Sequence, residues 1–521
     1  MELLLRLIAS FLHIVGIILS PIIAYFTGGK RVKIPPPSQP ELTNIPIVDL
    51  VPKIRQRELK SEELVRAYVE RIRAVNPILN AIVEDRCAGA IKDAQQVDQL
   101  IKTTPPEQLD ALFGRHPLLG VPFTVKESCG LKGMSHVVGN EHRYLLHSEN
   151  NGEAVELLRD AGCIPLLVSA NPEFCQSWET TTKTHGRCNN PFDTRKTPGG
   201  SSGGEGALLG CGASPFGVGS DIAGSIRLPA LFNGIFGHKP TGGLVSVTGH
   251  YPMSDDKLFR KYLQVGPMTR YARDLPLLLQ IMSGSNADKL EFSKPIHTKD
   301  INIHYMIEEE LTFTRWPVDS DFKVAILRAI KHFESNGMKA KEVKIKDFTK
   351  SLEITLASAF DVETPSILNN PNKPNHPDNV WAELGKSLIG DSKYSFNGLF
   401  LEVLRGLNGL IPKDKVKYWL KEGDAIKAEL TNLLGSEGVL LIPTFHRTAM
   451  SHNTSVFNLG GVPFLSIFNI IGFPATHIPM GLNSDGIPIG FQVVAAPYKD
   501  KLCIQIAAEL EAAFGGWVHP N

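Results

Sequence analysis

The stretch PGGSSGGEG, residues 198–206, followed by GSDIAGSIR, residues 219–227, determines the interpretation of the rest of this chain. Four glycines surround the pair Ser201 and Ser202, so the backbone there can adopt positive φ or approach another group closely. Small residues precede Ser225 and leave backbone N–H groups beside its hydroxyl. A nucleophilic serine needs an exposed hydroxyl and donors that stabilise an oxyanion, and both segments are compatible with that role.

Other interpretations of these segments must be weighed first. The run Gly-Gly-Ser-Ser-Gly-Gly taken alone is more often a flexible loop than an active site. A phosphate-binding P-loop is excluded because no Gly-Lys-Ser/Thr closes the stretch. Ser225 is not a Gly-x-Ser-x-Gly nucleophile elbow either, since Ala223 and Arg227 occupy the outer positions. Residues elsewhere in the chain must therefore decide between a loop and an active site.

Composition limits the possible classes of protein. The 521 residues, 42% of them hydrophobic and 21% charged, are typical of a globular protein with one large domain or two. The net charge is zero and no basic stripe with interleaved aromatics is present, so we expect no nucleic-acid partner. The seven cysteines show no CxxC spacing. We therefore expect neither a metal site nor a disulfide framework.

The N-terminus predicts a membrane anchor over residues 1–28. Residues 3–26 carry one formal charge, at Arg6, and a helix of that length would reach about 36 Å, which exceeds the roughly 30 Å hydrocarbon layer. A cleaved signal peptide and a buried soluble helix are the alternatives. Lys30, Arg31 and Lys33 follow the segment and favour a cytoplasmic body by a small margin, so the orientation stays open. We expect a single-pass protein of the endomembrane system.

After a proline-rich linker over residues 29–44, helical and strand patterns alternate. Amphipathic helices are predicted from Ser61 and over residues 153–161, and apolar strands over 118–127 and 163–169. Such alternation predicts an α/β fold whose central sheet is covered by helices. We assign residues 45–521 to one domain, and interpret 285–430, which is richer in charged and aromatic residues, as a variable elaboration that forms part of an acyl channel and a membrane-facing surface.

Activation of a serine hydroxyl requires a base. The 16 histidines leave a Ser-His-Asp triad open, although His185 and His238, near the serine segment, are better explained as structural residues. Lys126 lies at the end of the predicted strand over residues 118–127. Burial disfavours the charged form of an amine, so a lysine in that position can act as a base. The alternative is a lysine that simply reaches solvent from the strand end.

Three segments taken together resemble the amidase signature family. They are PFTVKE at residues 122–127, GGSSGG at 199–204 and GSDIAGSIR at 219–227, and their order and spacing match the family's pattern. The segment NGIFGHKP, residues 233–240, resembles the family's continuation. The resemblance extends from about residue 45 to the C-terminus and implies a mixed central β-sheet with helices on both faces.

The resemblance also implies the roles of individual residues. Ser225 would be the nucleophile, Ser201 would sit on a cis peptide and relay the proton, and Lys126, neutral at the start of the cycle, would be the base. The backbone N–H groups of Ile222, Ala223, Gly224 and Ser225 would form the family's oxyanion hole. Ala223 departs from the family's pattern, which often has glycine there, and its methyl group could lower the catalytic efficiency by restricting the backbone or narrowing the pocket. The residues that hold these loops would be Ser202, Asp221 and Arg227.

Combined with the apolar N-terminus, the resemblance implies a membrane-anchored serine amidase. Its substrates would be fatty-acid amides, cleaved through an acyl-enzyme to fatty acid and amine without a metal or cofactor. Its expected partners are the lipid amide and the membrane, and a homodimer stays open. The alternatives are an amidase or esterase for small polar substrates, a soluble component of an amidotransferase complex and an inactive membrane scaffold. The intact Lys126, Ser201 and Ser225 argue against the scaffold.

Overall fold

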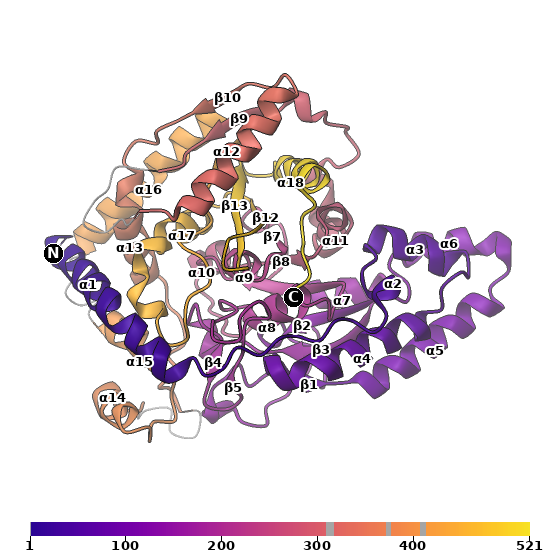
Figure 1. Ribbon diagram of the computed structural model, residues 1–521, viewed down its shortest axis with the longest axis horizontal. Coiled ribbons are helices and arrows are strands. Elements are labelled where there is room, and N and C mark those ends of the chain that lie inside the picture. The colour runs from indigo at the N-terminus through magenta and orange to yellow at the C-terminus, as the bar shows by residue number, and fades with distance from the viewer. Residues whose placement is uncertain (1, 309–316, 371–376, 407–412, 521) are drawn as a thin grey trace.

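A mixed sheet of 11 strands forms the centre of the protein, seen in the computed structural model, which describes residues 2–308, 317–370, 377–406 and 413–520 (Figure 1). The strand order is β1-β3-β2-β6-β8-β7-β12-β13-β11-β9-β10. The strands are β1 (Ile82–Asp85), β2 (Pro122–Lys126), β3 (Ile164–Ser169), β6 (Phe216–Asp221), β7 (Phe236–Lys239), β8 (Gln264–Thr269), β9 (Asn302–Tyr305), β10 (Ala340–Glu342), β11 (Gly438–Ile442), β12 (Ala475–Leu482) and β13 (Pro488–Ala495). A separate pair is formed by β4 (Thr181–Thr182) and β5 (Gly186–Arg187).

The two apolar runs predicted as strands are β2 and β3, which pair in parallel. Every residue of both strands is buried, as expected for strands covered on both faces. β2 also pairs in parallel with β6, whereas β6 pairs antiparallel with β8. Because β2 ends at Lys126 and β6 ends at Asp221, these parallel neighbours bring the end of segment 122–127 and the start of segment 219–227 to the same edge of the sheet.

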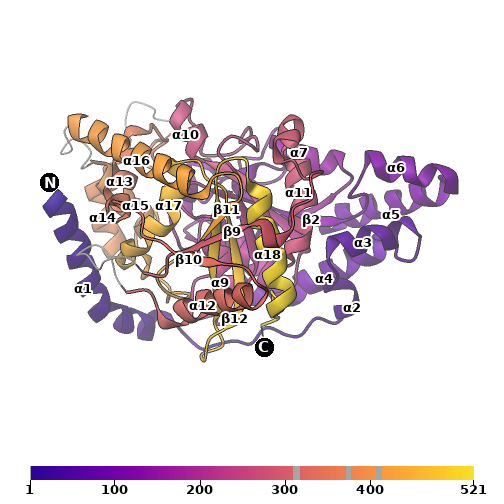
Figure 2. The same ribbon diagram turned by 90° about the horizontal axis from the view of Figure 1, so that it is seen from above.

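Helices cover the sheet on both faces, which confirms the predicted α/β fold (Figures 1 and 2). α8 and α9 pack on each other and on the sheet, and α11 and α18 form a second such pair. The helices of the body before residue 285 are α2 (Pro40–Thr43), α3 (Ile47–Arg55), α4 (Ser61–Leu79), α5 (Cys87–Thr103), α6 (Leu109–Arg115), α7 (Glu153–Asp160), α8 (Gly203–Gly210), α9 (Arg227–Asn233), α10 (Lys257–Tyr262) and α11 (Leu275–Met282). Those near the C-terminus are α17 (Val462–Ile470) and α18 (Asp500–Phe514).

The region 285–430 contributes both to the sheet and to a helical layer. Its strands β9 and β10 extend the central sheet beyond β11 in parallel. Its helices are α12 (Ser320–Ser335), α13 (Ser351–Asp361), α14 (Val380–Leu388), α15 (Phe396–Gly406) and α16 (Lys413–Leu434), and α13 packs against α16 and α17. Residues 309–316, 371–376 and 407–412 of this region lie outside the described residues. Its interpretation as a variable elaboration stays a prediction.

The predicted apolar N-terminal helix is α1 (Glu2–Thr27), which lies along the outside of the body (Figures 1 and 2). Residues Ser10–Thr27 form one apolar window long enough to span a membrane, with only 6% of it buried. The following segment is held against the body, since Arg31 Nη2 donates to Phe192 O at 2.8 Å and Val32 N donates to Thr194 Oγ1 at 2.9 Å. The stretch predicted as a linker therefore fixes α1 close to the domain.

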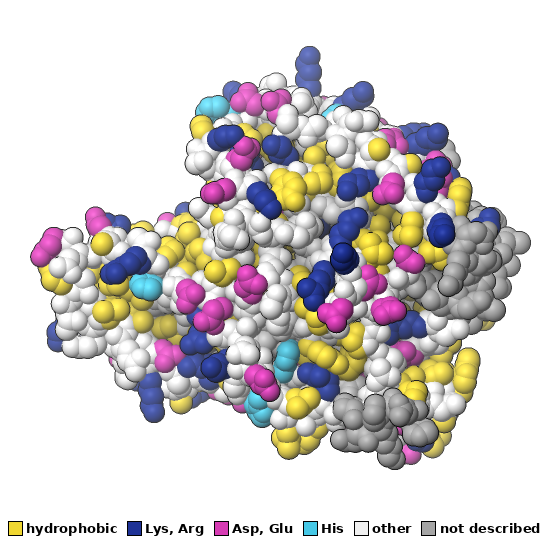
Figure 3. Space-filling view, turned by 180° about the vertical axis from the view of Figure 1, so that it is seen from behind, with side chains coloured by type: hydrophobic (Ala, Val, Ile, Leu, Met, Phe, Trp, Pro, Cys, Tyr) yellow, Lys and Arg dark blue, Asp and Glu magenta, His cyan; other side chains and the backbone are white. Residues whose placement is uncertain are grey.

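The surface carries charges of both signs. On the face shown in Figure 3, basic and acidic side chains are interspersed with apolar ones. This distribution is consistent with the equal numbers of basic and acidic residues in the sequence, 54 of each.

Candidate active site

Ser201 lies in a loop whose backbone requires glycine at positions 199 and 200. The peptide between Gly200 and Ser201 is cis, and Gly199 has a φ of +85°. A Cβ on Gly200 would lie 2.4 Å from the carbonyl oxygen of Ser177. The glycines of this segment therefore serve close backbone approach and positive φ, rather than flexibility.

Lys126 points from the end of β2 into the same place. Its side chain is completely buried, and its Nζ lies 2.6 Å from Ser201 Oγ and 2.9 Å from Ser220 Oγ. This lysine therefore does not reach solvent from the strand end, contrary to the alternative considered from the sequence. An amine within hydrogen-bond distance of a serine hydroxyl has the geometry of a base that can accept its proton.

Ser225 lies in the short connection between β6 and α9 and lines the same cavity as Ser201. Gly224 before it has a φ of +96°, and a Cβ there would lie 2.4 Å from Leu465 Cδ1. The two serine loops are tied together, because Ser202 N donates to Ser225 O at 3.2 Å. Ser202 Oγ also lies 3.3 Å from both N and O of Ser220. The structure thus brings the three predicted triad residues to one site.

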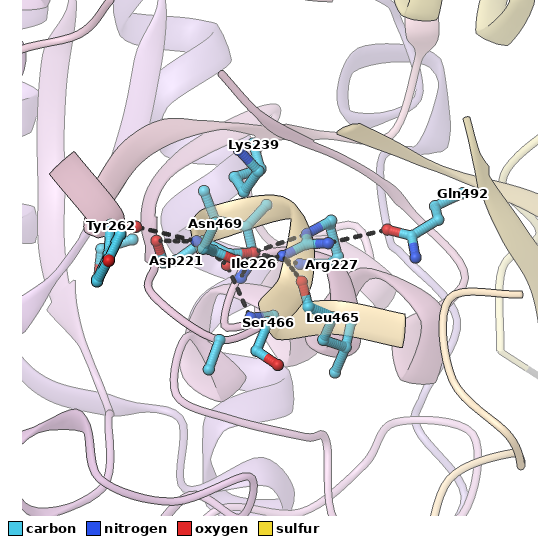
Figure 4. Close-up of polar contacts among 12 residues, drawn as sticks. Asp221, Ile226, Arg227, Lys239, Tyr262, Leu465, Ser466, Asn469 and Gln492 are labelled. Atoms are coloured by element: carbon cyan, nitrogen blue, oxygen red, sulfur yellow. Dashed lines mark hydrogen bonds and ion pairs between the residues drawn. The ribbon is translucent and has the colours of Figure 1, made fainter. Parts of the chain in front are cut away.

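Asp221 and Arg227 form a completely buried ion pair behind the Ser225 loop (Figure 4). Nε and Nη2 of Arg227 each lie 3.1 Å from an oxygen of the carboxylate. Burial works to raise the pKa of Asp221, but the guanidinium outweighs it and holds that pKa well below its usual range. The carboxylate also accepts from the backbone N–H groups of Gly224 at 2.7 Å and Ile226 at 3.0 Å. The pair therefore fixes the backbone on either side of Ser225.

The four predicted oxyanion donors are not equivalent. The N–H of Gly224 is already directed to Asp221, so it is engaged in this structure. Ile222 and Ala223 are partly exposed and line the cavity beside Ser225. Ala223 does not have the positive φ that would demand glycine, so its methyl group is compatible with this loop. The prediction of an oxyanion hole therefore rests on the N–H groups of Ile222, Ala223 and Ser225.

Two polar residues at the site were not predicted from the sequence. Ser220 Oγ contacts Lys126 Nζ, and His250 Nε2 lies 2.9 Å from the same Ser220 Oγ. Ser220 is inside the segment 219–227, but nothing in the sequence indicated that its hydroxyl faces the lysine. His250 lies in a loop without any motif, so no sequence signal separated it from the other histidines. His238, by contrast, is a buried residue bonded to Thr476 and Asp500, a structural role as expected.

The serines open into an apolar cavity of about 380 Å³. Helices α10, α13, α15 and α17 supply much of its wall, together with the loop after η4 (Glu173–Cys175). Its apolar lining includes Phe259, Leu263, Leu352, Val362, Val462 and Ile470. Among the described residues, no group of three or more His, Cys, Asp or Glu is placed to hold a metal ion. The hydroxyl-bearing residues Ser201 and Ser225 therefore line a largely apolar space suited to a hydrocarbon chain.

A family model described as Amidase matches residues 63–504. The chain belongs to the amidase signature family. It is 37% identical to fatty-acid amide hydrolase 2-A of Danio rerio over 504 residues, 94% of this chain and 92% of that protein. It is 36% identical to fatty-acid amide hydrolase 2 of Homo sapiens over 511 residues, 96% of this chain and 94% of that protein.

Solved structures confirm the amidase-signature fold. A structure titled "Fatty acid amide hydrolase" superimposes with a TM-score of 0.71 at 21% identity, covering 92% of this chain and 86% of that one. A bacterial aryl acylamidase of the amidase signature family gives a TM-score of 0.70 at 18% identity, covering 90% of this chain and 96% of that one. At these identities the likeness establishes the fold alone.

Proposed function

We propose that this protein is a membrane-anchored serine amidase that hydrolyses fatty-acid amides to fatty acid and amine. The observation that carries the proposal is the cavity, which is apolar over most of its wall and contains Ser225 and the Lys126-bonded Ser201 at one place. A hydrocarbon chain buried there would bring a terminal carboxamide to the hydroxyl of Ser225. The identity with fatty-acid amide hydrolases 2 over almost the whole chain supports the same substrate class.

In the proposed reaction, Ser225 Oγ attacks the amide carbonyl carbon. Its proton passes to Ser201 Oγ while the proton of Ser201 passes to Lys126 Nζ. Lys126 then returns a proton through Ser201 to the amide nitrogen, the C–N bond breaks, and the amine leaves an acyl-enzyme on Ser225. Water attacks this ester by the same relay, which releases the fatty acid and restores the Ser225 hydroxyl.

The developing negative charge on the carbonyl oxygen would be stabilised by backbone N–H groups of the Ser225 loop. Ile222 and Ala223 line the cavity, and the buried pair of Asp221 and Arg227 holds the loop in place. A preorganised loop of this kind costs no rearrangement when the charge forms, which is why such donors contribute strongly to catalysis.

The position of α1 supports a role in substrate collection. α1 packs against η10 (Ser455–Phe457) and η11 (Leu459–Gly461). Ser455, Val456 and Leu459 of these turns also line the cavity. The same two turns therefore contact the apolar helix and line the cavity. We propose that α1 anchors the protein in an endomembrane and that the amide enters from the lipid phase.

Hydrolysis of saturated primary amides of increasing acyl length by detergent-solubilised protein tests this function, with Ser225→Ala as the control. We expect kcat/KM to rise with chain length and the variant to be inactive. Equal activity on short polar amides or esters would retain the chemistry and refute the lipid substrate. Loss of activity in both proteins, without labelling by a fluorophosphonate, would favour an inactive scaffold.

A further inference from the structure

Buried polar contacts connect Lys126 to His250 through the hydroxyl of Ser220. Lys126 Nζ lies 2.9 Å from Ser220 Oγ, and Ser220 Oγ lies 2.9 Å from Nε2 of His250. The other ring nitrogen of His250, Nδ1, lies 3.0 Å from the carbonyl oxygen of Pro252. All three side chains are buried, and Ser220 and His250 also line the cavity that contains Ser201 and Ser225.

These contacts fix which way the hydrogen bonds run. A carbonyl oxygen only accepts, so Nδ1 of His250 carries the proton and donates to Pro252. The ring is neutral, because burial and the nearby Lys126 lower the pKa of His250 to about 3. Nε2 of a neutral ring protonated at Nδ1 is an acceptor. The hydroxyl of Ser220 must therefore donate its proton to His250.

This direction has a consequence for the lysine. Since Ser220 gives its only proton to His250, it can only accept from Lys126. A neutral amine has one lone pair, and that lone pair is what a general base uses. If Ser220 were free to donate to Lys126, it would compete for the lone pair with Ser201, which lies 2.6 Å from Nζ.

We propose that His250 is a positioning residue: it orients the Ser220 hydroxyl so that the lone pair of Lys126 is left to Ser201. His250 acts on the two reacting serines through Ser220 and Lys126. The inference rests on the proposed role of Lys126 as the base. It adds a residue from a separate loop to the relay.

A matched pair of variants separates the two hydrogen bonds of His250. The carboxamide oxygen of His250→Gln can take the place of Nε2 and accept from Ser220, whereas the amide nitrogen of His250→Asn can take the place of Nδ1 and donate to Pro252. The rate of fluorophosphonate labelling of Ser225 and kcat for a long-chain amide are measured for both. We expect His250→Asn to lower both rates at least about tenfold with KM within about twofold, and His250→Gln to stay within about threefold of the wild type.

The reverse ranking, with His250→Asn as fast as the wild type and His250→Gln slow, would overturn the inference and leave His250 a residue that holds its loop. Ser220→Ala provides an independent test should His250→Asn fold poorly. We expect Ser220→Ala to stay within about threefold of the wild type, because it removes the hydroxyl that could donate to Lys126, and His250→Asn to add less than about twofold to it. A further tenfold loss in the double variant would contradict the coupling.

The labelling rate keeps this test separate from the proposed function. A protein that is labelled at Ser225 but hydrolyses no fatty amide would refute the substrate class, while the ranking of the two His250 variants would still decide the role of His250.

Discussion

Arg227→Met removes the cation that neutralises the buried carboxylate of Asp221. Methionine has no charge and no hydrogen-bond donor, so the substitution removes the cation together with the hydrogen bonds of the guanidinium. The guanidinium also donates to Gln492 Oε1 at 2.9 Å, Leu465 O at 2.9 Å and Asn469 Oδ1 at 2.7 Å (Figure 4). Removing one partner of a buried ion pair costs about 3–5 kcal/mol, because the remaining charge is left uncompensated.

That loss is a large part of the about 5–15 kcal/mol by which proteins are stable. We expect the free energy of unfolding of Arg227→Met, from urea denaturation followed by circular dichroism in detergent, to fall by about 3–5 kcal/mol. Labelling of Ser225 should also slow, since Asp221 holds the N–H groups of Gly224 and Ile226. Arg66→Met is the matched control: its partner Glu62 lies one helical turn away on the surface, where solvent screens the pair and its loss should change stability little.

A second variant tests the physical cause. Asp221→Asn combined with Arg227→Met removes both charges, so the double variant should be at least about 1 kcal/mol more stable than the sum of the single losses predicts. Two results would contradict this electrostatic explanation: an Arg227→Met protein within about 1 kcal/mol of the wild type, or single losses that simply add.

Three further predictions concern the loop, the cavity wall and the anchor. Gly224→Ala should slow labelling of Ser225 at least about tenfold, because the φ of +96° and a Cβ placed 2.4 Å from Leu465 Cδ1 force the loop to move. The control is Gly385→Ala, whose added Cβ meets nothing within 4 Å. Unchanged labelling of Gly224→Ala would contradict this prediction. Burial raises the pKa of Glu173 to about 7, so the folded protein holds a proton that the unfolded chain releases, and stability should fall as pH rises from about 4.5 to 7. Glu173→Gln should remove up to about 3 kcal/mol of this pH dependence, measured from melting curves at several pH values. The same dependence of stability on pH in both proteins would contradict the assignment. Deletion of residues 1–28 should abolish sedimentation with lipid vesicles, whereas undiminished sedimentation, or a wild-type protein whose N-terminus is found cleaved by mass spectrometry, would refute the anchor.

Much of the fold could be predicted because the decisive segments are local. The apolar strands β2 and β3 each occupy a short continuous run, and the resemblance of the signature segments to the amidase family implied a mixed sheet, which the observed pairings contain. Lys126 could be assigned to the site from the family resemblance, because its position at a strand end also allowed a lysine that reaches solvent. By contrast, β9 and β10 extend the sheet from the middle of a charged region, and their positions depend on pairing with β11, far away in the sequence.

The rest of the site depends on tertiary contacts that no spacing encodes. His250 joins the site through its contact with Ser220 in β6, and a single histidine in a loop has no periodicity to reveal this. The hydrogen bond from the Gly224 N–H likewise depends on the orientation of the Asp221 carboxylate, which cannot be predicted from the order of residues alone. Both details arise from side-chain geometry rather than from sequence patterns.

The proposed function depends above all on Ser225 being an activated nucleophile at the end of an acyl-binding cavity. The most direct test is the rate at which a fluorophosphonate modifies Ser225, located by peptide mass spectrometry, in the presence of primary amides of increasing chain length. We expect modification at Ser225 that long-chain amides slow far more than short ones at equal concentration. Modification elsewhere, or protection that does not depend on chain length, would contradict the proposal.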